Sequence, residues 1–107
     1  MKSERVTSIS PDHPSLSGHF PGRPVVPGVV LLQEVMDTVR RTLPAEPVVT
    51  SLPVVKFSSP LKPGECVTIE VDQETAGRII FSCRVDQRLI ASGVIECASR
   101  AAQVEGV

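Results

Sequence analysis

The chain has 107 residues, of which 41% are hydrophobic and 21% are charged, and its formal net charge is −1 at pH 7. This length accommodates one domain with one core. The near-neutral charge and an aromatic content of 3%, without Trp or Tyr, disfavour nucleic-acid binding, which depends on phosphate attraction and base stacking. No apolar stretch approaches the roughly 18 residues of a membrane span, so we expect no membrane partner either.

The cysteines and the N-terminal residues indicate a cytoplasmic protein. No apolar signal region follows Met1, and the three cysteines, Cys66, Cys83 and Cys97, are far apart in the sequence. Their spacing is not that of metal ligands, and no glycine-rich phosphate loop is present. We therefore expect no metal, nucleotide or redox cofactor, and small core cysteines in a reducing compartment.

The first element expected is a short strand around Val6 and Ile9, which Pro11 ends. A turn-rich stretch follows, and its His13 is typical of a loop histidine. Residues 18–28 then read GHFPGRPVVPG, so prolines and glycines surround His19. Proline restricts φ and glycine permits tight turns, and this composition therefore indicates a rigid loop that positions the imidazole. An exposed histidine in an ordinary proline-rich loop is the alternative.

A long helix is predicted from Gly28 to about Leu43. Pro27 suits the start of a helix and Pro44 ends it. Asp37 and Arg41 have the spacing of a helical ion pair. Apolar residues recur at helical spacing, at Val29, Leu32, Val35, Met36, Val39 and Leu43. Val30 and Leu31 add apolar surface to the first turns, which favours a central helix over a surface one.

Only strands are predicted after the helix. Residues 48–52 and 54–57 are rich in β-formers, and Pro53 between them indicates a bulge or a sheet edge. Residues 66–72 and 78–85 alternate between apolar and polar positions and are separated by a turn at 74–77. The inward positions expected are Val67, Ile69 and Val71, then Ile79, Phe81, Cys83 and Val85, and in the last strand Leu89, Ala91, Ile95 and Cys97.

This order predicts an α+β domain in which an antiparallel sheet wraps around one long central helix. One sheet with one helix leaves an open edge and a small core, and a dimer is expected for that reason.

Two segments carry a family resemblance. Residues 18–29, GHFPGRPVVPGV, resemble the active-site segment of the β-hydroxyacyl-acyl-carrier-protein dehydratases, the 3-hydroxymyristoyl- and 3-hydroxydecanoyl-type enzymes, which have the hot-dog fold. Residues 55–65, VKFSSPLKPGE, resemble the strand and turn that follow the central helix in that family. The resemblance implies one hot-dog domain over residues 1–107 and a homodimer or higher even oligomer with shared active sites. It also implies an acyl thioester on acyl-carrier protein or coenzyme A as substrate.

Loss of water from a 3-hydroxyacyl thioester needs a base, an acid and donors to the thioester oxygen. A histidine can act as base near neutral pH, and N–H groups at a helix start can hold the oxygen. By the resemblance His19 and Gly28 match these two roles. The same resemblance suggests residues that line the acyl tunnel, namely Phe20, Val25, Val26, Pro27, Val29, Val30 and Phe57.

The third role departs from the family pattern. The family's catalytic Asp or Glu falls on position 33, where this chain has Gln33. An amide can donate a hydrogen bond but has no acidic proton to give. Glu34 is the neighbouring carboxylate, but one residue along a helix is a rotation of about 100°, so we expect it to face elsewhere.

Three functions remain open on the sequence. The first is a dehydratase, attenuated by Gln33 or using it to orient a hydroxyl or a water. The second is a hot-dog thioesterase, and the third is a non-catalytic acyl-thioester-binding subunit. An acidic carrier protein would need nearby cations, for which Arg23, Lys56 and Lys62 are candidates, although solvated surface charges are as good an interpretation.

Overall fold

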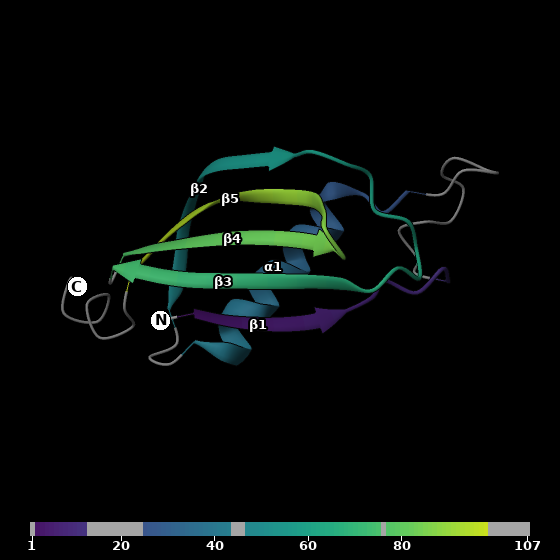
Figure 1. The fold of residues 1–107 in the computed structure, drawn as a ribbon. Coiled ribbons are helices and arrows are strands. Elements are labelled where there is room, and N and C mark those ends of the chain that lie inside the picture. The colour runs from purple at the N-terminus through teal and green to yellow at the C-terminus, as the bar shows by residue number, and fades with distance from the viewer. Residues whose placement is uncertain (1, 13–24, 44–46, 76, 99–107) are drawn as a thin grey trace.

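The fold was analysed in a computed structural model that describes residues 2–12, 25–43, 47–75 and 77–98. Its elements are β1 (Lys2–Thr7), α1 (Gly28–Thr42), β2 (Val48–Phe57), β3 (Val67–Thr75), β4 (Arg78–Val85) and β5 (Arg88–Ala98). The five strands form one sheet in the order β1-β3-β4-β5-β2, and every neighbouring pair is antiparallel. Helix α1 crosses one face of this sheet (Figure 1). An antiparallel sheet with a single helix against it, within the described residues, is the arrangement expected for a hot-dog fold.

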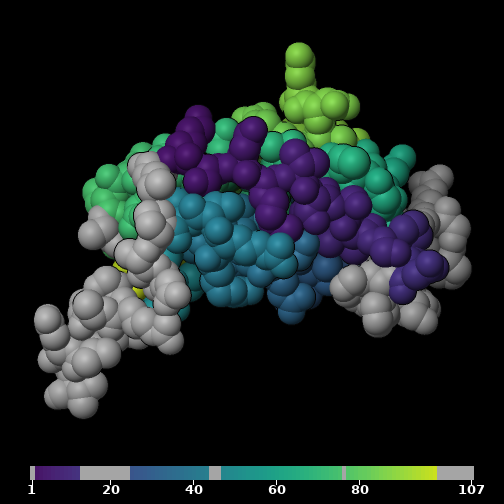
Figure 2. Space-filling model, turned by 90° about the horizontal axis from the view of Figure 1, so that it is seen from below, coloured from purple at the N-terminus to yellow at the C-terminus, as the bar shows by residue number. Residues whose placement is uncertain are grey.

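Helix α1 confirms the predicted span. It begins at Gly28, directly after Pro27, and ends at Thr42, with Leu43 already in extended conformation. The side chains on its sheet-facing side are buried, and they are Val30, Leu31, Val35, Thr38 and Val39. The opposite side is open, and Figure 2 shows α1 beside β1 on one face of the molecule. The helix is therefore amphipathic in the single chain.

The inner face of the sheet follows the predicted alternation in β3 and β4. Val67, Ile69 and Val71 are fully buried, and they pack with Ile79 and Phe81 of the neighbouring strand. The alternate residues of β3 face the opposite side of the sheet. The core thus lies between α1 and the centre of the sheet.

Two details of the strands differ from the sequence prediction. The opening strand is Lys2–Thr7, so Ile9 lies beyond it and is buried, whereas Val6 points to the outer face and is exposed. In β5, Ile90 is buried and Leu89 only half-buried, because the β4–β5 pairing shifts register between Cys83 and Arg84. Such a bulge reverses which side chain faces the core.

Strand β2 is an edge strand, as Pro53 predicted. It pairs with β5 alone among the described strands, and its register shifts between Val49 and Ser51 and again between Ser51 and Val54. Its side chains are exposed or half-buried, including Leu52 and Phe57. This edge therefore combines apolar side chains with backbone groups that no other described strand pairs with.

Candidate functional site

A cavity of about 400 Å³ opens beside the start of α1. Its walls come from the residues before the helix, from the first helical turn, from the end of β2 with the loop after it, and from β5. The lining residues are Val25, Val26, Gly28, Leu31, Phe57, Ser58, Ser59, Pro60, Leu61 and Ile90. The size and the mainly apolar lining are those of a site for a small organic ligand or an acyl chain.

Backbone hydrogen bonds hold these separate segments together. The N–H of Val26 donates to the carbonyl of Leu61 at 2.8 Å, which joins the approach to α1 to the loop after β2. The N–H of Ser58 donates to the carbonyl of Ile90 at 2.8 Å, which joins that loop to β5. The cavity wall is therefore built from paired backbone.

The loop after β2 has a second attachment at its far end. The carboxylate of Glu65 accepts the backbone N–H of Lys62 at 2.8 Å and the guanidinium of Arg88 at 2.9 Å. These contacts, the backbone N–H of Lys62 first, lower the pKa of Glu65 below its ordinary value. The loop is thus tied to the hairpin between β4 and β5.

The start of α1, where Gly28 lines the cavity, carries backbone donors that are unpaired among the described residues. Pro27 offers no side-chain cap, and its carbonyl accepts the N–H of Val30 at 3.0 Å. Within the described residues, the N–H groups of Gly28 and Val29 have no acceptor. The first turn also lacks an acidic side chain. The partial positive charge of a helix N-terminus is therefore available to an oxygen or anion placed there.

The ring of Phe57 lies directly against Gly28. A β-carbon built at Gly28 would be 2.7 Å from Cζ of Phe57, closer than side-chain contacts allow. Phe57 as a residue is 54% exposed. Glycine at position 28 therefore permits an aromatic ring to lie on the first turn of α1, where both residues line the cavity.

The structure separates the remaining residues predicted for the site. Gln33 and Val29 are exposed on the side of α1 that faces away from the sheet, and neither lines the cavity. Val30 belongs to the core. His19 and Phe20 lie outside the described residues, so their predicted roles stay predictions.

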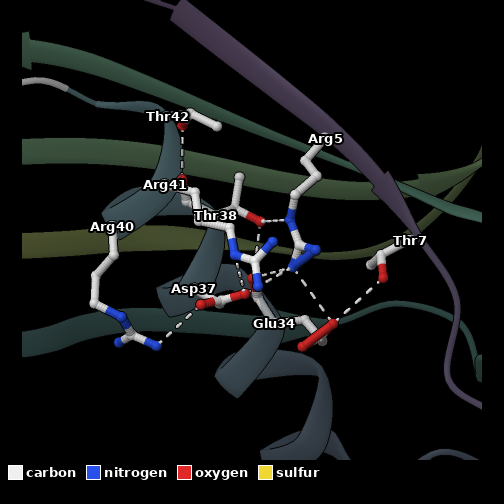
Figure 3. A network of polar contacts seen from close by, with 8 residues as sticks. All are labelled: Arg5, Thr7, Glu34, Asp37, Thr38, Arg40, Arg41 and Thr42. Atoms are coloured by element: carbon white, nitrogen blue, oxygen red, sulfur yellow. Dashed lines mark hydrogen bonds and ion pairs between the residues drawn. The ribbon is translucent and has the colours of Figure 1, made fainter.

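Glu34 lies on the β1 side of α1 (Figure 3). Its Oε1 is 3.4 Å from Nη2 of Arg5 and 3.4 Å from Oγ1 of Thr7. Arg5 also reaches Asp37, with Nη2 3.4 Å from Oδ2. The carboxylate next to Gln33 is thus engaged with β1.

Three further expectations concern metal ions, membrane-spanning helices and basic side chains near the cavity. The described part of the chain contains no group of His, Cys, Asp and Glu side chains that could hold a metal ion. No helix within it is long and apolar enough to cross a membrane. Lys56 and Lys62, which flank cavity residues, are exposed, whereas Arg23 lies outside the described residues.

Sequence reasoning missed part of the cavity wall. Ser58, Ser59, Pro60 and Leu61 lie in the second segment of family resemblance, but only Phe57 of that segment was assigned to the site. Their place in that segment is the sequence feature that could have assigned them to the site. Ile90 had no such indication, because its inward orientation depends on the bulge in β5.

Comparison with known proteins supports one family. The chain is 31% identical over 108 residues to the 3-hydroxyacyl-[acyl-carrier-protein] dehydratase FabZ of Vibrio parahaemolyticus, covering 89% of this chain and 72% of the relative. FabZ of Aliivibrio fischeri is 28% identical over the same coverage. Among solved structures, the dehydratase heterocomplex ApeI:P from Xenorhabdus doucetiae aligns with a TM-score of 0.79 and 26% identity, over 91% of this chain and 87% of that one.

The family model of ApeI dehydratases matches residues 2–94, which include all of α1 and most of the sheet. The resemblance noted at residues 18–29 and 55–65 is thereby confirmed. The chain belongs to the ApeI-like dehydratase family and has the hot-dog fold.

Proposed function

We propose that this chain dehydrates 3-hydroxyacyl thioesters to enoyl thioesters in the cytoplasm, in fatty-acid or related lipid or polyene biosynthesis. The acyl group would be carried on acyl-carrier protein or coenzyme A. One observation carries the proposal most directly: Gly28, whose N–H has no acceptor among the described residues, lines an apolar cavity large enough for an acyl chain. Family membership supplies the reaction class.

In the proposed mechanism the thioester oxygen accepts the N–H of Gly28 while the acyl chain enters the cavity. The positive end of the α1 dipole stabilises the negative charge that develops on this oxygen when the proton next to the carbonyl is removed. His19 removes that proton. The hydroxyl group then leaves and must receive a proton, and Gln33 orients it or a water molecule without supplying the proton itself.

This arrangement makes the enzyme a slow one. A positioned general acid contributes typically 10²–10⁴-fold to rate, which is roughly 3–5 kcal/mol of barrier. With Gln33 in the place of a carboxylate, the imidazolium of His19 is the remaining proton source in the mechanism. We therefore propose attenuated rather than abolished activity.

A second subunit completes the proposed site. Gln33 is exposed on the outer side of α1, and the edge strand β2 carries exposed apolar side chains at Val54 and Phe57. A second copy that covered both surfaces would pair with the edge strand and lie beside Gln33, in keeping with the shared active sites that the family resemblance implies. We propose a homodimer or a higher even oligomer on this ground. The ApeI:P structure is a heterocomplex, so a different hot-dog chain is the alternative partner.

The test is turnover of a 3-hydroxyacyl thioester, offered on acyl-carrier protein and on coenzyme A, by purified oligomer. Wild type, His19→Ala and Gln33→Glu are compared, with Gln87→Glu as matched control because it adds the same charge on an exposed turn. We expect slow turnover in wild type, loss in His19→Ala, a gain of at least about tenfold in Gln33→Glu, and no change in Gln87→Glu. Unchanged turnover in His19→Ala would refute the mechanism.

A non-catalytic acyl-binding subunit is the second candidate, and Gln33 is the observation that favours it. It predicts a wild type that binds the thioester without converting it, even when Gln33→Glu converts it. The hot-dog thioesterase is a third possibility, and it predicts release of free thiol instead of an enoyl product. The enoyl product and the free thiol are both measured in the turnover reactions described above.

A further inference from the structure

We propose that Arg5 is a positioning residue that sets the rotation of α1 about its axis and thereby the placement of Gln33. This inference rests on the proposed function, because it assigns Gln33 a role in the site. It concerns a residue of β1 that is far from the cavity residues in the sequence. Arg5 also lies outside both segments of family resemblance, residues 18–29 and 55–65. Arg5 alternates with the outward residues of β1 and pairs with the fully buried Ile69, so its side chain lies on the inner face.

The guanidinium of Arg5 makes four contacts to one side of α1, through Nε and Nη2 (Figure 3). Its Nε donates to Oγ1 of Thr38 at 3.2 Å, and its Nη2 lies 3.4 Å from carboxylate oxygens of both Glu34 and Asp37. Nη2 also donates to the backbone carbonyl of Glu34 at 3.5 Å. The side chain is 20% exposed, which limits solvent screening of these contacts.

Thr38 gives Arg5 a defined hydrogen-bond acceptor on α1. It is fully buried, and its hydroxyl donates to the carbonyl of Glu34 at 2.8 Å while accepting from Arg5. The partners of Arg5 therefore lie one turn apart on a single side of the helix. The guanidinium of Arg5 is rigid and planar, and it contacts side-chain and backbone oxygens on that side of the helix. These contacts define one rotation of α1 relative to β1.

Most other contacts of α1 are less selective for rotation. Apart from the hydrogen bond that Thr7 donates to Glu34, the contacts of α1 with the sheet come mainly from apolar side chains such as Val35 and Val39, and burial of apolar surface is non-directional. Hydrogen bonds, by contrast, weaken steeply when the angle at the donor hydrogen changes. Among the described residues, the polar contacts from β1, four from Arg5 and one from Thr7, therefore distinguish one helix rotation from a neighbouring one, and Arg5 supplies most of them.

The rotation of α1 sets the direction in which Gln33 points, as it does for every residue of the helix. Gln33 lies next to Glu34, one step of about 100° around the helix, and its side chain is exposed without a contact that would hold it among the described residues. Displacement of a reacting group by about 1 Å can cost as much as 10²-fold in rate. The position of Gly28 depends less on Arg5, because the hydrogen bond between Val26 and Leu61 anchors the chain just before Gly28.

The experiment compares Arg5→Met with Arg41→Met. Arg41 binds the same carboxylate, with Nε 2.7 Å from Oδ2 of Asp37, but from within α1, so it cannot set the rotation of the helix against the sheet. We expect Arg5→Met to lower kcat about tenfold with little change in KM, and Arg41→Met to leave both unchanged. Arg5→Lys should recover part of the loss, and it serves in place of Arg5→Met should that variant not fold.

The decisive comparison repeats Arg5→Met in a Gln33→Ala background. A residue that acts through Gln33 has no further effect once that side chain is removed, whereas a merely structural residue costs the same factor in both backgrounds. Equal losses would overturn the proposal. Amide NMR signals of Gln33 provide a readout that needs no turnover: they should shift in Arg5→Met and not in Arg41→Met. An inert wild type would refute the proposed function, and unshifted Gln33 signals would refute the role of Arg5.

Discussion

The contact between Gly28 and Phe57 supports a sharp prediction for Gly28→Ala. The added β-carbon would lie 2.7 Å from Cζ of the ring and 3.0 Å from Cε1, so the ring must retreat by about 0.7 Å to reach the 3.4 Å of an ordinary contact. The ring is about half exposed and can move. Because Ala retains the backbone N–H, any loss of activity would come from the displaced ring.

The effect on stability should be small. Ala is favoured over Gly by up to about 1 kcal/mol inside a helix, and less in the first turn. Overpacking against a fixed core side chain costs about 1–3 kcal/mol, but a half-exposed ring relaxes more easily. We expect the free energy of unfolding to stay within about 1 kcal/mol of wild type, while kcat/KM falls about tenfold because the mouth of the cavity changes.

The assay is a double-mutant cycle with Phe57→Ala, read by steady-state turnover and by urea unfolding. In the Phe57→Ala background the three closest ring atoms are gone, so Gly28→Ala should change kcat/KM by less than about twofold. A tenfold loss in that background as well would show that the helix start itself, and not the ring, is sensitive to Ala. That result would refute the reasoning.

Three further predictions test the fold. Gly93→Ala should lower the free energy of unfolding by about 3 kcal/mol or more in urea titrations, because its β-carbon would collide with the backbone carbonyl oxygen of Val54. Glu65→Gln should destabilise the protein at pH 7, and the difference from wild type should shrink as the pH falls from the ordinary pKa of 4.5 through the lowered pKa of the folded state. Iodoacetamide at pH 8 should label exposed Cys66 well before Cys83, whose pKa burial raises to about 12.

Each of these predictions has its own control. Ser92→Ala, next to Gly93 on the outer face, should stay within about 0.5 kcal/mol of wild type. A difference between wild type and Glu65→Gln that persists unchanged at pH 3 would contradict the assigned carboxylate contacts. Mass spectrometry measures the rate of labelling at each cysteine. If Cys83 were labelled as fast as Cys66, the burial of Cys83 in β4 would be contradicted.

Local pattern predicted the elements well and their register less well. The span of α1 and the inward residues of β3 follow from periodicity in neighbouring residues, which each segment encodes by itself. The exchange of Leu89 for Ile90 on the inner face does not, because it arises from a register shift against β4. Likewise, Ile9 is buried without belonging to β1.

The candidate site divides in the same way. The sequence by itself determined the family, through residues 18–29 and 55–65, and the replacement of the expected carboxylate by Gln33. Only the tertiary structure decided that Phe57 lies on Gly28, that Ile90 closes the cavity, and that Arg5 reaches across to Glu34. These contacts join residues far apart in the chain, and their existence depends on strand order and helix rotation. No local pattern contains that information, because it arises only when the whole core packs at once.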